Sequence, residues 1–167
     1  MRICIDTNIY SAFKNGDKEI IELLENSDEL LIPVVVLGEL YAGFHIGSRL
    51  KENLKELDLF LNMPGVYTVK IDREIADRYG MLIKILKEQG TPIPTNDVWI
   101  AATALEKGTK LATFDTHFRK SFKQRNSVNG KGFSGNFPHR TSMTETFNPR
   151  IIILPISRPT LNVMSEI

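Results

Sequence analysis

The sequence predicts an α/β fold in which helices cover both faces of a mainly parallel sheet of four or five strands. Strand-like apolar runs alternate along the chain with segments of helical periodicity, and this alternation is typical of parallel sheets. The chain has 167 residues, of which 42% are hydrophobic and 25% charged, which suits one globular domain with a sizeable core. We therefore expect a single domain over residues 1–167.

The first half of the chain opens with two expected strands, each followed by helix. Residues 2–6 (RICID) read as a short buried strand that ends at an acid, and one or two helical turns follow at 8–15. Asp17 is a typical cap for the helical KEIIELLEN segment behind it. The second strand is expected at 29–34 (ELLIPV), and a helix from about 35 to 44 follows it.

The middle of the chain continues with helix, strand and helix. Residues 49–62 form a strongly helical pattern, in which one face carries Leu50, Leu54, Leu57 and Leu61. A third strand is expected at 66–71, and Asp72 caps a long helix that runs to about Gln89 before Gly90. The residues expected to face inward from this helix are Ile75, Tyr79, Leu82, Ile83 and Leu86.

PTNDVWIAATAL at 94–105 begins the next helix, which is expected to end near Glu106. Thr95 or Asn96 can cap its first turn, and Asp97 meets the positive end of the helix dipole. Taken alone, this helix-start role of Asp97 is the favoured one. KLATF at 110–114 is the fourth expected strand and leads to Asp115.

The last quarter of the chain differs in composition from the rest. Residues 121–150 lack periodicity and are rich in Gly, Ser, Asn and Thr, which predicts a long loop inserted before the last strand. IIILPI at 151–156 is expected to be that fifth strand.

Composition gives information about the partners and the cellular compartment of the protein. The net charge of +1 argues neither for nor against a nucleic-acid partner. No apolar stretch reaches the length of a membrane span, since the longest, 30–38, is followed directly by Glu39, and no secretion signal is recognised. The single cysteine, Cys4, cannot form an internal disulfide, which is typical of a reducing compartment. We expect a cytoplasmic protein without membrane association.

Four acids lie in apolar surroundings, and an unpaired buried carboxylate is costly. Asp6 and Asp115 each follow an expected strand and so belong at the carboxyl edge of the sheet, where ligand sites form. Separate roles remain open, such as an ion pair for Glu39 and a turn or helix cap for Asp115. One shared site accounts better for the full set, which comprises Asp6, Glu39, Asp97 and Asp115.

Converging carboxylates repel one another unless a cation compensates their charge. Oxygen ligands without a His/Cys cluster favour the hard cations Mg²⁺ or Mn²⁺ over zinc. Such a site keeps coordination positions open for water and substrate phosphates, which suits phosphodiester hydrolysis.

Four motifs carry a family resemblance: DTN at 6–8, GEL at 38–40, NDVWIAA at 96–102 and TFDTHF at 113–118. Together they resemble the PIN-domain ribonucleases, and most of all the VapC-type toxins of bacterial toxin–antitoxin pairs. The resemblance covers about residues 1–120. It implies a PIN-like three-layer α/β/α fold and a Mg²⁺- or Mn²⁺-dependent endoribonuclease.

The resemblance also implies roles for individual residues. Asp6 and Asp97 would be the principal metal ligands, Glu39 would help to orient the attacking water, and Asp115 would complete the site. Polar family positions beside the acids are matched by Asn8 and Thr113, from which we expect hydrogen bonds to the metal ligands; a plain helix cap is the equal alternative for Asn8. The family further implies an RNA substrate, a VapB-like antitoxin and a homodimer. The apolar helices within 35–61 could supply such contacts, although for most of their residues the plainer interpretation is that the apolar faces complete the core.

The insertion at 121–150 departs from the family pattern. Its basic residues could bind RNA phosphates, and its phenylalanines could stack on unpaired bases; a solvated surface loop is the plainer interpretation. The basic candidates are Lys123, Arg125, Lys131, Arg140 and Arg150, and the aromatic ones are Phe133, Phe137 and Phe147.

Three other functions are alternatives to the toxin ribonuclease. A PIN domain could bind RNA or a partner without cutting, or could be a nuclease of RNA processing or one directed at DNA rather than a toxin. An acid-nucleophile phosphotransferase would need a second acid two residues after Asp6, where this chain has Asn8.

Overall fold

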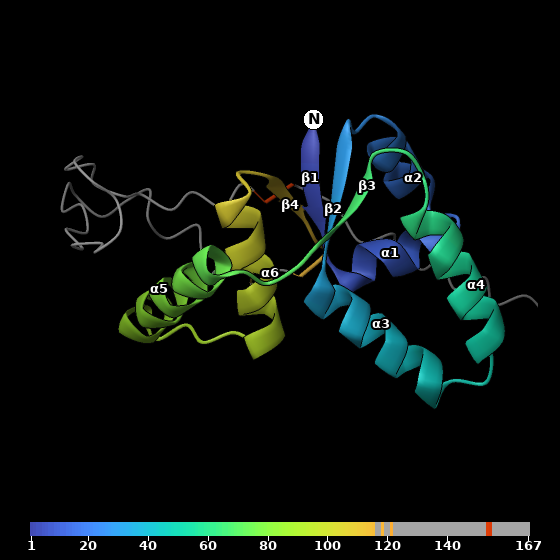
Figure 1. The fold of residues 1–167 in the computed structure, drawn as a ribbon. Coiled ribbons are helices and arrows are strands. Elements are labelled where there is room, and N and C mark those ends of the chain that lie inside the picture. The colour runs from blue at the N-terminus through green and yellow to red at the C-terminus, as the bar shows by residue number, and fades with distance from the viewer. Residues whose placement is uncertain (116–117, 119–120, 122–152, 155–167) are drawn as a thin grey trace, which may run out of the picture.

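The computed structural model describes residues 1–115, 118, 121, 153 and 154. Strands and helices alternate there as the sequence predicts (Figure 1). The strands are β1 (Arg2–Ile5), β2 (Glu29–Pro33), β3 (Val66–Val69) and β4 (Lys110–Ala112). The helices are α1 (Thr7–Lys14), α2 (Lys18–Glu25), α3 (Val34–Ile46), α4 (Leu50–Leu61), α5 (Arg73–Gln89) and α6 (Thr95–Glu106).

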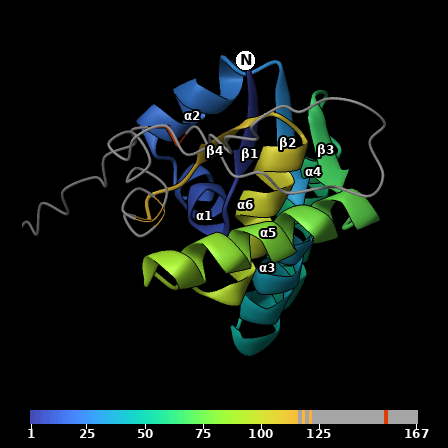
Figure 2. The same ribbon diagram turned by 90° about the vertical axis from the view of Figure 1, so that its left-hand side faces the viewer.

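The four strands form one sheet in the order β3-β2-β1-β4, and every neighbouring pair is parallel. Helices α5 and α6 lie on one face of this sheet, while α1, α2 and α4 lie on the other, as the two perpendicular views show (Figures 1 and 2). The three-layer α/β/α fold is therefore confirmed. Because the strands are parallel, the starts of α1 and α3 meet at the same edge of the sheet.

The core is built around the central strand β1. Ile3, Cys4 and Ile5 are completely buried, as parallel strands covered on both faces must be. Helix α6 packs on the sheet through small side chains such as Ala101 and Ala102, both 0% exposed. Burial also raises the pKa of the Cys4 thiol, so Cys4 is a neutral core residue.

The long helix α5 differs from the sequence prediction at one inward position. Ile75, Leu82 and Leu86 are buried as expected, but Ile83 is 38% exposed and Ile85 is only 5% exposed. A helix advances 100° per residue, so Ile85, three residues after Leu82, returns to the buried stripe, while Ile83 lies beside it.

This correction can be checked by stability. We expect Ile85→Ala to lower the free energy of unfolding by at least about 2 kcal/mol, because it leaves a cavity in the core. Ile83→Ala removes the same atoms from a more exposed place and should cost well under half as much. Urea unfolding of both variants measures the difference; equal losses would contradict the orientation of α5.

The helix starts confirm two predicted caps and refute a third. Asp17 accepts hydrogen bonds from the backbone N–H groups of Glu19 and Ile20, and Asp72 accepts one from Ile75. Helix α6 instead begins after Pro94, without any side-chain cap hydrogen bond. The prediction that Thr95 or Asn96 caps α6 is therefore wrong.

The fourth strand is shorter than predicted, because β4 ends at Ala112 rather than Phe114. The backbone N–H of Asp6 donates to the carbonyl of Ala112 at 3.3 Å, and the chain then leaves the sheet. Asp115 therefore lies three residues beyond the strand instead of directly after it, which corrects its expected position.

The predicted fifth strand is seen in part. Ile153 forms a parallel bridge with Leu111, and the N–H of Leu154 donates to the Leu111 carbonyl at 2.9 Å. The rest of 151–156, and almost all of the predicted insertion at 121–150, lie outside the described residues. In the part of the chain that is described, no helix is long and apolar enough to cross a membrane.

Candidate active site

Asp6 occupies the carboxyl end of the central strand and begins α1. Only 4% of its surface is exposed. Its Oδ1 accepts a hydrogen bond from the backbone N–H of Ile9 at 2.9 Å, and its Oδ2 accepts one from the Thr113 hydroxyl. Asn8 also hydrogen-bonds to this carboxylate. Thr113 and Asn8 thus hydrogen-bond to Asp6, and their support of a metal ligand stays a prediction. Asp6, not Asn8, is the cap of α1.

The surroundings of Asp6 make its ionised form less favourable than it is in water. Burial raises the pKa of this carboxyl, although hydrogen bonds from Thr113, Ile9 and Asn8 oppose the shift. No lysine or arginine among the described residues forms an ion pair with it. A buried carboxylate without a cation partner is costly to ionise, and a nearby cation would offset that cost.

Glu39 lies half-buried on α3 and is held through both of its oxygens. The Thr7 hydroxyl donates to Oε2, and the Asn96 side-chain amide donates to Oε1 at 2.7 Å. Thr7 follows Asp6 in the chain, and Asn96 precedes Asp97. The hydrogen bonds of Glu39 therefore connect the starts of the two helices that carry these other acids.

Asp97 and Asp115 complete the predicted set, and both are half-buried. Asp97 lies in the first turn of α6. The backbone N–H of Asp115 donates to the Thr113 hydroxyl at 3.0 Å, so Thr113 contacts both Asp6 and the Asp115 backbone. The segments of all four acids are in this way linked at the carboxyl edge of the sheet.

The structure stops short of a closed metal centre. Among the residues it describes, no three His, Cys, Asp or Glu side chains are grouped so that they could hold one metal ion. The metal roles of the four acids stay predictions. The RNA-binding candidates Lys123, Arg125, Lys131 and Arg140 lie outside the described residues.

The sequence did not predict that Thr7 and Asn96 donate hydrogen bonds to Glu39. Each is adjacent to an acid within a motif, and Asn96 had a ready role as a helix cap. The sequence shows only that each polar residue stands next to an acid, and this does not identify the acid to which it donates.

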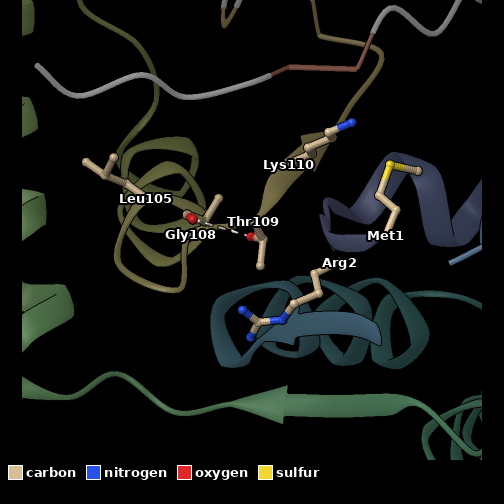
Figure 3. A pocket seen from close by; sticks show the side chains of 7 residues that line it. Met1, Arg2, Leu105, Gly108, Thr109 and Lys110 are labelled. Carbon is tan, nitrogen blue, oxygen red and sulfur yellow. Dashed lines mark hydrogen bonds between the residues drawn. The ribbon is translucent and has the colours of Figure 1, made fainter. Parts of the chain in front are cut away.

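Two hollows of the described surface lie away from the four acids. One, of about 520 Å³, is found at the amino ends of β1 and β4 and is lined by Met1, Arg2, Ala104, Leu105, Gly108, Thr109 and Lys110 (Figure 3). Another, of about 510 Å³, includes Arg2, Asp72 and Lys107. Neither of these two hollows is lined by any of the four acids.

Comparison with known proteins gives consistent relatives. The PIN domain family matches residues 3–122. Ribonuclease VapC1 of Haemophilus influenzae (strain R2866) is 32% identical over 125 residues, which are 72% of this chain and 89% of that protein. Ribonuclease VapC2 of Rickettsia felis (strain ATCC VR-1525 / URRWXCal2) is 31% identical over 113 residues, covering 65% and 83% respectively.

Solved structures resemble the chain over the same part. VapBC2 from Rickettsia felis, bound to a DNA fragment from its promoter, superposes with a TM-score of 0.65 and 26% identity. That match covers 72% of this chain and 92% of the other. VapBC-1 from nontypeable Haemophilus influenzae gives a TM-score of 0.65 at 27% identity, covering 74% and 93%.

Proposed function

The chain belongs to the PIN domain family, and from this we propose that it is an endoribonuclease, the toxin of a toxin–antitoxin pair, which hydrolyses RNA phosphodiester bonds. The observation that carries the proposal is the buried Asp6, which has no cation partner among the described residues and is linked through Thr113 to the segment of Asp115. Relatives that the chain spans over most of their length are named ribonucleases.

We further propose that the reaction depends on Mg²⁺ or Mn²⁺. The donor atoms are carboxylate oxygens, which these hard cations prefer. Mg²⁺ usually takes only one or two protein carboxylates, together with water and substrate phosphates. Asp6 and Asp97 would hold the ion, with Asp115 beside them, so three grouped carboxylates are not required. When bound, the cation would neutralise charge that develops on the phosphodiester.

The chain's own residues would supply orientation. Glu39, held by Thr7 and Asn96, offers a fixed carboxylate to orient the attacking water. Thr113 and Asn8 fix the Asp6 carboxylate before any ligand arrives. Such preorganisation reduces the reorganisation needed during reaction.

We propose a VapB-like antitoxin as the protein partner and a homodimer as the assembly. The structural relatives include complexes named VapBC. Helix α3 is apolar on nearly all sides, and Val34, Tyr41 and Ile46 remain 40%, 39% and 87% exposed. An apolar helix face of this kind favours burial against a partner. Light scattering on the purified chain would measure the oligomeric state.

We also propose a cytoplasmic location, with which a single buried cysteine, Cys4, is compatible.

Cleavage of total small RNA by the purified chain tests the proposed function. We expect cuts at discrete sites in the presence of Mg²⁺ or Mn²⁺, no cuts in excess EDTA, and none with Asp97→Asn. The amide keeps the shape of Asp97 but removes the negative charge that would attract the ion.

The matched control is Asp77→Asn, which makes the same change on the exposed surface of α5 and should cut like the wild type. Cleavage that survives both EDTA and Asp97→Asn would reveal a contaminating nuclease. Metal-dependent RNA binding without any scission would favour a non-catalytic binding module instead.

A further inference from the structure

We propose that Thr7 and Asn96 are positioning residues for Glu39, which together hold its carboxylate in a single orientation during RNA cleavage. The inference rests on the proposed function and deepens it. Nothing in the four-acid pattern requires it, because in the sequence Thr7 could simply begin a helix and Asn96 could simply cap one.

The two hydrogen bonds connect the Glu39 carboxylate to two different helices, α1 and α6. Thr7, the first residue of α1, donates to Oε2, and Asn96, the second residue of α6, donates to Oε1 at 2.7 Å. Occupying both oxygens from different sides restrains the rotation of the carboxylate about its terminal bond. A single donor would restrain that rotation less.

The chemistry of Asn96 fixes the direction of its hydrogen bond. An amide facing a carboxylate must present its nitrogen, since its oxygen would be repelled and could donate nothing. Asn96 makes no cap hydrogen bond in α6, whose capping position is Pro94. Its side chain is exposed, so core packing does not explain its contact with Glu39.

Helix α3 itself provides no hydrogen-bond donor to the Glu39 carboxylate among the described contacts. Glu39 is the only acid in Val34–Ile46, and its hydrogen-bond partners among the described residues are Thr7 and Asn96. Because these two residues adjoin Asp6 and Asp97, they fix Glu39 relative to the two predicted metal ligands.

Kinetics of the full-length chain test this role. We expect Asn96→Ala and Thr7→Val each to lower kcat about 10- to 100-fold, as is usual when groups that orient active-site ligands are removed, with a much smaller change in KM. Thr7→Ser keeps the hydroxyl and should recover most of the loss caused by Thr7→Val. The melting temperature should stay close to that of the wild type. Asn62→Ala, which removes a side-chain amide at the end of α4, is the matched control.

A double-mutant cycle asks whether the effect passes through Glu39. In a Glu39→Ala background, Asn96→Ala and Thr7→Val should cause no further loss of residual cleavage or of Mn²⁺ affinity measured by calorimetry. An undiminished loss in that background would mean that these side chains contact substrate or metal directly, and it would overturn the proposal. So would Thr7→Val with full activity.

A spectroscopic measurement separates this inference from the proposed function. The side-chain amide signals of Asn96, assigned by their absence in Asn96→Ala, should shift in the ¹H–¹⁵N spectrum of Glu39→Ala. If they shift but the wild type never cuts RNA, the hydrogen bond stands and the proposed function fails together with the positioning role. If they do not move while the wild type cuts, the contact is absent in solution and only this inference is overturned.

Discussion

Asp6→Asn should abolish RNA cleavage while leaving the free chain at least as stable as the wild type. Removing a ligand of a catalytic cation forfeits several kcal/mol of transition-state stabilisation, and each loss of about 1.4 kcal/mol is tenfold in rate. We therefore expect a decrease of about 10³-fold or more. Opposite effects on activity and stability are the mark of a residue retained for function at a cost to the fold.

Stability should not fall, because removing the buried charge outweighs the changed hydrogen bond to Thr113. The amide oxygen can still accept from the Ile9 N–H, and the amide nitrogen can donate to the Thr113 hydroxyl oxygen, whose own hydrogen then no longer has Asp6 as its acceptor. The cost of ionising a carboxyl that is 4% exposed disappears.

Two measurements on the same sample check this prediction, namely RNA cleavage with Mg²⁺ and urea unfolding in EDTA. Asp17→Asn is the matched control, because Asp17 caps α2 as Asp6 caps α1, and Asn serves as a cap about as well as Asp. It should change neither quantity. Retained cleavage in Asp6→Asn would remove Asp6 from the metal site, and a large loss of stability would make it a structural residue.

Much of the fold could be predicted because local signals and burial agree in this chain. Strand β1 is an apolar run apart from Arg2, as expected of a parallel strand covered on both faces. Asp17 and Asp72 are the N-caps of α2 and α5, and residues of this type predict helix starts. The errors arise where long-range contacts decide. Phe114 looks like part of a strand, yet the sheet ends at Ala112, where Asp6 makes its backbone contact.

The candidate site shows the same division. Asp6 and its partner Thr113 could be anticipated, because each belongs to a motif at a strand end. Asn96 could not be assigned correctly, since the first turn of α6 offered it a local hydrogen bond and only the fold brings Glu39 within 2.7 Å. The position of a residue in a helix predicts its possible partners, but the packing of α3 against α1 and α6 selects the actual one.

Divalent cations should stabilise the wild type and reverse the pH dependence that Asp6 gives to its stability. Without cations, the pKa of Asp6 lies above its ordinary value of 3.8, so the folded chain binds the proton more tightly than the unfolded chain. Between these two pKa values the free energy of unfolding therefore falls as pH rises. This contribution is seen as the difference between the wild type and Asp6→Asn across an acidic titration in EDTA.

We expect a bound cation to change the sign of this effect, because it favours the ionised carboxylate and lowers the pKa of Asp6 in the folded chain below its value in the unfolded chain. At a concentration 100 times its dissociation constant, a ligand that binds only the folded chain stabilises it by about 2.7 kcal/mol. For a chain of this size that corresponds to a rise in Tm of about 5–10 °C. Scanning calorimetry of the wild type with Mg²⁺ or Mn²⁺ at neutral pH measures it. The rise should disappear in Asp6→Asn and persist in Asp17→Asn; an equal rise in all three proteins would place the cation elsewhere and leave the burial of Asp6 without a functional reason.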